Sequence, residues 1–103
     1  MPKIKDGVHL ILRERQRQII EKGWSASHDS GHRRGQLADA AACYALAGKR
    51  KDGQPVRYWP WDMRYWKPTP DDRVRELVKA GALIAAEIDR IIDEDGDAEA
   101  KRA

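Results

Sequence analysis

The sequence contains a single cysteine among 103 residues, Cys43, so the chain cannot form an internal disulfide. One thiol fits a reducing compartment, and the alanine-rich run around Cys43 predicts a small buried side chain. Apolar runs are short and broken by charge within a few positions, which excludes a membrane-spanning helix. The segment MPKIKDG lacks the apolar core of a signal peptide. These absences predict a cytoplasmic protein without a membrane partner.

Sequence signatures of several common chemistries are absent as well. The sequence shows no internal repeat, glycine-rich phosphate loop, nucleophile elbow or zinc-ligand spacing. Its 20 basic and 17 acidic residues give a formal charge of +3, which favours anionic ligands without forming a nucleic-acid-binding tail. The basic residues do not line one recognition helix. Nucleic acid therefore stays an open but less favoured partner.

The strongest periodic pattern covers residues 71–92, where apolar residues recur at the three-and-four spacing of one helical face. Thr69 is expected to be the N-cap and Pro70 the first helical residue, followed by two aspartates in the first turn. Around Gly81 the side chains shrink to alanine, which lets another backbone or a ligand approach closely. The apolar face consists of Val74, Leu77, Val78, Gly81, Ala82, Ile84, Ala85, Ile88, Ile91 and Ile92.

Two further helices are expected, over residues 6–22 and residues 32–47. The first has only a narrow apolar stripe, and Glu14, Arg15 and Gln18 fall on or beside it. Polar groups at the edge of a core need partners, so these three form interhelical salt bridges or belong to a binding site. The second helix carries an alanine-rich face suited to close packing against the middle of the final helix.

The sequence therefore predicts an all-α protein with three main helices. Residues 1–92 are expected to form a single helical domain, and residues 93–103 a charged flexible tail. A helical chain this small often completes its core by pairing with copies of itself, so we expect a homo-oligomer.

Two connecting segments contain candidate residues for a binding site. His28, Asp29 and His32 cluster in a loop after the first helix, where they cap the next helix, contact a ligand or hold a metal. Five of the seven aromatic residues fall between Tyr58 and Trp66. They cover the core or form an interface, or they offer a stacking surface for a purine. The stacking candidates are Trp59, Trp61 and Trp66.

Five strings, ILRERQRQIIEKGW, SHDSGH, QLADAAACYALA, WPWDMRYWKP and RELVKAGALIAAEIDRI, resemble a group of short proteins encoded in tailed-phage and prophage genomes. The resemblance runs from about Leu12 to Ile92. The order of an ERQRQ helix, a KGW turn, an LADAA helix and an RELVKA helix is also similar to the MazG-like all-α nucleotide pyrophosphohydrolases. This second resemblance implies a MazG-like bundle, whose acidic residues hold Mg²⁺ to assist attack by water on a triphosphate.

The metal-binding motifs of the MazG-like family are incomplete in this sequence. Two adjacent glutamates and a third one turn later correspond here to Asp39, Ala40 and Cys43. The partner motif Glu-x-x-Asp corresponds to Glu76 and Lys79. An ammonium at this place opposes a metal and can instead supply the counter-charge of a phosphate. The resemblance therefore implies a nucleotide pocket without the hydrolytic machinery.

Our first hypothesis is a phage-encoded protein of the bacterial host cytoplasm that binds a nucleotide or nucleotide-derived signal without turnover or cofactor, to sequester a host immune messenger. Lys79 and Arg15 would meet phosphates, the tryptophans would stack on the base, and polar residues would contact ribose or base. The residues assigned to ligand binding are Glu14, Arg15, Gln18, His28, Asp29, His32, Trp59, Trp61, Trp66, Lys79 and Glu87.

Two alternatives remain open from the sequence. The first is a Mg²⁺-dependent nucleotide pyrophosphohydrolase with relocated ligands, namely Glu14, Asp39, Glu76 and Glu87. The second is a small DNA-binding or protein-interaction module that uses the aromatic segment as its contact surface.

Overall fold

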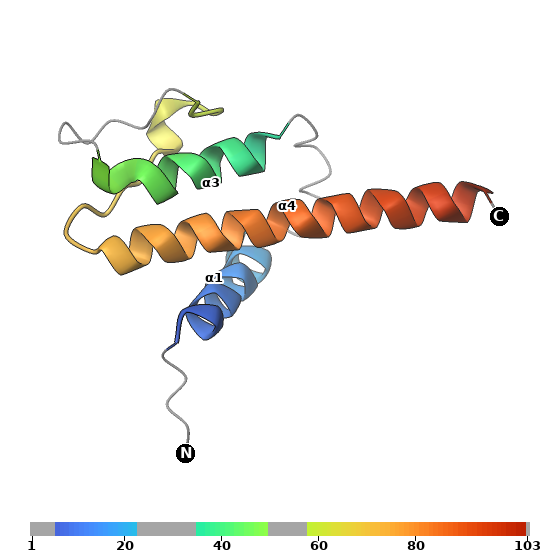
Figure 1. The fold of residues 1–103 in the computed structure, drawn as a ribbon, viewed down its shortest axis with the longest axis horizontal. Helices are drawn as coiled ribbons and strands as arrows, with labels where there is room; N and C mark the ends of the chain where they lie inside the picture. Colours follow the sequence, from blue (N-terminus) through green and yellow to red (C-terminus); the bar gives the residue numbers. More distant parts are fainter. Residues whose placement is uncertain (1–5, 23–34, 50–57, 103) are drawn as a thin grey trace, which may run out of the picture.

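The computed structural model describes residues 6–22, 35–49 and 58–102 of the chain. Every regular element in these ranges is helical, and no strand occurs in them (Figure 1). The structure thus confirms the all-α class and the three main helices. The α-helices are α1 (Gly7–Lys22), α3 (Gln36–Leu46) and α4 (Arg73–Arg102), and the 3₁₀ turns are η1 (Ala47–Lys49) and η2 (Met63–Tyr65).

The longest helix, α4, is the element on which the other two pack. α3 lies antiparallel beside the first half of α4, and α1 crosses the same half of α4 steeply (Figure 1). The crossing point is Gly81, where an added Cβ atom would lie 2.5 Å from Cδ1 of Ile11 in α1. The close approach expected around Gly81 is therefore made by a side chain of α1.

The start of α4 differs from the prediction. The side chain of Asp72, and not that of Thr69, caps the helix by accepting a hydrogen bond from the Arg75 amide at 3.0 Å. Thr69 Oγ1 instead donates to the carbonyl of Asp72 at 3.1 Å, and the Thr69 carbonyl accepts from the Asp72 amide at 2.8 Å. Thr69 and Pro70 thus open a turn that precedes the helix.

The end of α4 differs as well, because the helix continues past Ile92 to Arg102. Apolar periodicity stops at Ile92, but charge pairs on the helix surface can extend a helix beyond its apolar face. Arg90 donates to Glu94 at 2.9 Å across this boundary. The predicted boundary at Ile92 is therefore wrong as a helix end, and the charged segment begins as a continuation of α4.

Helix α3 begins at Gln36, later than the predicted start at His32. Gly35 has a φ angle of 77°, in the left-handed region that glycine adopts without strain, and this conformation cannot belong to a right-handed helix. Residues 32–34 lie outside the described part of the chain.

The apolar core lies between α3, α4 and the segment that follows residue 58. Small side chains of the two helices meet there, as the alanine-rich face of α3 predicted, and Cys43 is fully buried among them. Burial raises the pKa of the Cys43 thiol. The buried core consists of Leu37, Ala40, Ala41, Cys43, Tyr44, Ala47, Trp66, Ala80, Leu83 and Ala86.

Candidate functional site

Three polar residues of α1 lie on one face and are buried against α4. Glu14, Arg15 and Gln18 expose only 4%, 6% and 3% of their surface. Arg75 of α4 donates to Glu14 at 2.7 Å, and Arg15 donates to Asp89 of α4 at 3.3 Å. The interhelical salt bridges predicted from these positions are therefore present.

Glu14 is the centre of this polar layer. Arg17 donates two hydrogen bonds to its carboxylate, at 2.8 and 2.9 Å, and Gln18 donates a third at 3.3 Å. Burial by itself raises the pKa of Glu14, but the hydrogen bonds and positive charges of Arg17 and Arg75 lower the pKa to about 2. Glu14 is consequently ionised at neutral pH, and its charge is shared between two guanidinium groups.

The side chain of Gln18 has one unsatisfied atom. Its Nε2 donates to Glu14, whereas the buried Oε1 has no hydrogen-bond partner among the described residues. A buried carbonyl oxygen without a donor costs free energy, on the order of 1–3 kcal/mol. Such an atom is suited to accept a hydrogen bond from a hydroxyl or amino group of a ligand.

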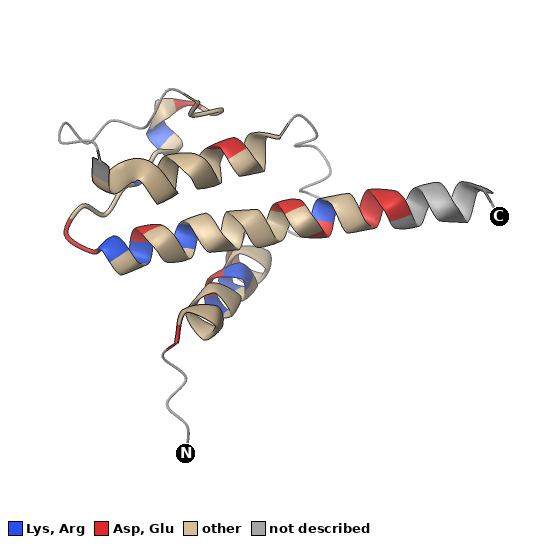
Figure 2. Ribbon diagram, viewed as in Figure 1, with Lys and Arg blue, Asp and Glu red and all other residues tan. Residues whose placement is uncertain are grey.

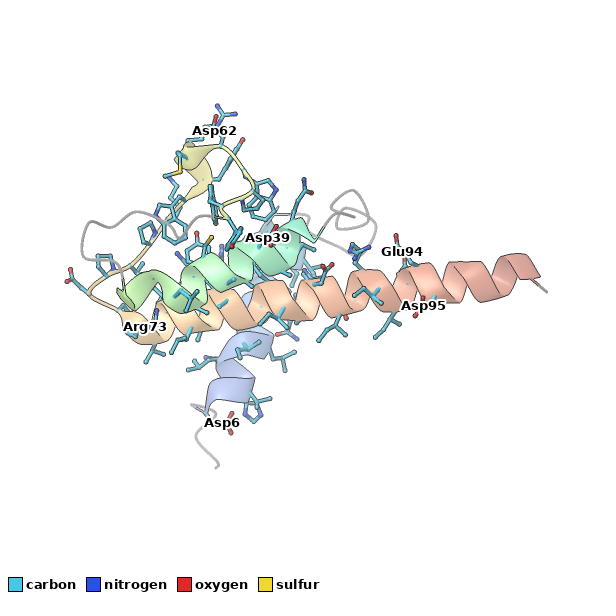
Figure 3. All side chains as sticks on the ribbon, turned by 45° about the horizontal axis from the view of Figure 1, so that its top comes forward. Asp6, Asp39, Asp62, Arg73, Glu94 and Asp95 are labelled. Carbon is cyan, nitrogen blue, oxygen red and sulfur yellow. The ribbon has the colours of Figure 1, made fainter. Side chains whose placement is uncertain are left out.

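Glu76 is buried one helical turn before Lys79. It accepts hydrogen bonds from the Thr69 amide at 3.2 Å and from Arg73 at 3.3 Å. Figure 3 shows Arg73 at the start of α4, beside the end of α3. There Arg73 also donates to the carbonyls of Tyr44, at 3.2 Å, and Ala45.

Lys79 neither points freely into solvent nor pairs with Glu76. Its Nζ donates to the carbonyl of Lys67 at 2.7 Å and lies 5.3 Å from the centre of the Tyr44 ring. Burial lowers the pKa of Lys79, and the positive charge of Arg75 lowers it further. Arg17 adds to this lowering, whereas the carboxylates of Glu14 and Glu76 oppose it. The ammonium group forms no ion pair with a carboxylate among the described residues.

These residues together form what we call the basic cluster, which consists of Arg17, Arg73, Arg75, Lys79, Glu14 and Glu76. Four cations and two carboxylates leave it with a formal charge of +2. The sequence analysis named Glu14 and Lys79 as candidate binding residues but did not name Arg75. The signal was present, since Arg75 precedes Lys79 by four residues and thus lies on the same side of α4.

The aromatic segment covers the core, which is one of the roles that the sequence left open for it. The Trp66 ring is buried and stacks on Tyr44, with 4.7 Å between ring centroids. Trp59 packs edge-on against Trp66 at 4.9 Å, and Trp61 packs edge-on against Trp59 at 5.4 Å. Trp59 and Trp61 stay partly exposed, so they are the two rings of the set that a base could reach without opening the core.

The remaining site candidates do not join the basic cluster. Glu87 binds Arg90 at 2.6 Å, and Asp39 lies partly buried on α3 (Figure 3). No group of three or more possible metal ligands occurs among the described residues, so the four acids of the hydrolase alternative do not converge there. His28, Asp29 and His32 lie outside the described part of the chain.

Comparison of the chain with protein families, with curated proteins and with solved structures found no match. No helix in the described ranges is long and apolar enough to span a membrane.

Proposed function

We propose that the protein binds a phosphorylated nucleotide, or a signal derived from one, without cleaving it. The observation that carries this proposal is the surplus of positive charge in the basic cluster, where four cations surround two carboxylates that arginines already bind. A phosphate would neutralise that surplus through charge-assisted hydrogen bonds. Arg75 and Lys79 are the proposed phosphate contacts.

Gln18 supports a nucleoside rather than a bare phosphate as the ligand. Its unsatisfied Oε1 is an acceptor, which repels a phosphate oxygen but accepts a hydrogen bond from a ribose hydroxyl or a base amino group. We place this contact beside the phosphate contacts because Gln18 and Arg75 both bind Glu14. Trp59 or Trp61 would stack on the base.

Binding without turnover follows from the same residues. A Mg²⁺ site needs free carboxylate oxygens, and in this structure Glu14 and Glu76 give theirs to arginines and a backbone amide. We propose Lys79 as the counter-charge that replaces the metal. The resemblance to phage proteins extends the proposal to sequestration of a host immune messenger in the bacterial cytoplasm. The small size of the helical chain extends it to a homo-oligomer.

Calorimetric titration of the full chain with nucleoside triphosphates and cyclic dinucleotides, in buffer with EDTA, tests the proposal. Lys79→Gln removes the charge but keeps a donor for the Lys67 carbonyl, and it should weaken binding about ten- to a hundredfold. Arg13→Gln removes one positive charge from an exposed position of α1 and should leave binding unchanged.

Two results would contradict the proposal. Equal affinity of wild type and Lys79→Gln would show that Lys79 does not contact phosphate. Binding that requires Mg²⁺, with release of pyrophosphate, would instead support a pyrophosphohydrolase.

A further inference from the structure

One face of α4 is apolar and uncovered. Its large side chains are each between 44% and 63% exposed, although they belong to the most strongly periodic segment of the sequence. α3 packs on another side of the helix through Leu83, whereas α1 reaches this face only at Gly81, through Ile11. We call this face the α4 stripe, and it consists of Val74, Leu77, Ile84, Ile88, Ile91 and Ile92.

The α4 stripe spans 19 residues from Val74 to Ile92, about 27 Å of helix. A partner with a long helix of its own would cover it.

The charges along α4 indicate what that partner is. Cations dominate the N-terminal part of the helix, whereas acids dominate beyond its middle (Figure 2). Arg73 and Leu77 are four residues apart, as are Ile91 and Asp95, so a cation and an acid flank the two ends of the stripe. Two parallel copies of α4 would bring like charges together. Two antiparallel copies bring each basic end beside an acidic end.

We infer that a second copy of this chain covers the α4 stripe, with the two α4 helices antiparallel about a two-fold axis near Ile84. In this arrangement Ile84 meets its own counterpart, and Leu77 of one chain meets Ile91 of the other, because both lie seven residues from Ile84. Such a contact is self-complementary, as a two-fold interface requires. It specifies the homo-oligomer proposed above and holds whether or not the basic cluster binds a nucleotide.

Sedimentation equilibrium of the full chain without ligand tests the assembly. The wild type should sediment at twice 11.8 kDa. Ile88→Asp places a charge in the stripe and should weaken dimerisation about a hundredfold or more, while its circular dichroism stays helical because Ile88 is half exposed. Ile20→Asp is the matched control, since Ile20 is exposed on α1, and it should stay dimeric. A monomeric wild type, or equal dimerisation of both variants, would overturn the inference.

Cysteine cross-linking tests the antiparallel register. A mixture of Leu77→Cys and Ile91→Cys chains should form disulfide-linked pairs, and neither variant alone should do so. The native Cys43 is buried, and wild type serves as its background control. Efficient cross-linking of either variant with itself would show parallel helices and overturn the proposed orientation. A wild type that dimerises but binds no nucleotide would contradict only the proposed function.

Discussion

α3 packs against α4 through alanine, leucine and aromatic side chains, whereas α1 packs against α4 through buried charged groups and one glycine contact. The energetics of the two contacts differ. Apolar burial stabilises the α3 contact in rough proportion to its area. The α1 contact depends on every charge keeping its partner, because an unpaired buried charge is strongly destabilising.

This difference shows which contact is suited to respond to its surroundings. An apolar contact is insensitive to pH and to anions. A polar layer with a net positive charge responds to both, since a proton or a phosphate changes its electrostatic balance. Three substitutions separate the two contacts, and each is measured as a free energy of unfolding by denaturant titration.

Trp66→Ala should have the largest effect, because it removes the ring that stacks on Tyr44 at the centre of the apolar contact. Truncation of a buried tryptophan costs about 3–5 kcal/mol. The loss should be the same at pH 5 and pH 8. Tyr65→Ala, which removes an exposed neighbouring ring, is the control and should cost far less. Equal losses would mean that Trp66 does not pack in the core.

Glu14→Gln tests the polar contact and should cost about 3 kcal/mol at neutral pH, because the folded pKa of Glu14 is about 2 and its ordinary value is 4.5. A lowered folded pKa stabilises the protein above pH 4.5, and this stabilisation disappears as the pH falls toward 2. The difference between wild type and variant should therefore shrink across that range. Glu21→Gln, the control, removes an exposed partner of Arg17 and should cost far less at neutral pH.

Gly81→Leu tests the one close approach in the polar contact. Its side chain would overlap Ile11, so we expect destabilisation by about 1–3 kcal/mol. The double variant Gly81→Leu with Ile11→Ala should recover part of this loss, because the shorter side chain vacates the space. Additive losses in the double variant would show that Ile11 is not the residue in conflict.

Periodicity and residue size made the apolar contact predictable from sequence. The alanine-rich face of α3 and the small residues near Gly81 both predicted tight packing, and both take part in it. The N-cap of α4 was harder to predict, because Thr69 and Asp72 both have suitable side chains. Only the turn at Pro70 decides between them, and Thr69 uses its hydroxyl within that turn.

The polar contact was predictable only in outline. Three polar residues on the core face of α1 indicated that partners had to exist, but nothing local to α1 identified them. The partner of Glu14 is Arg75, 61 residues away. A chain with 20 basic residues offers many candidates, and their choice depends on the angle at which α1 crosses α4. That angle follows from packing and not from any single motif.

The guanidinium of Arg73 has a consequence for how the helices form. It binds the Ala45 carbonyl and the Tyr44 carbonyl in the last turn of α3, and the Tyr44 carbonyl also accepts from the Ala47 amide. α3 has only 11 residues, too few for an isolated helix to persist in water. The first residue of α4 thus completes the last turn of α3. We therefore expect the two helices to form as one cooperative unit, in which the protection of the α3 amides from solvent exchange depends on both helices.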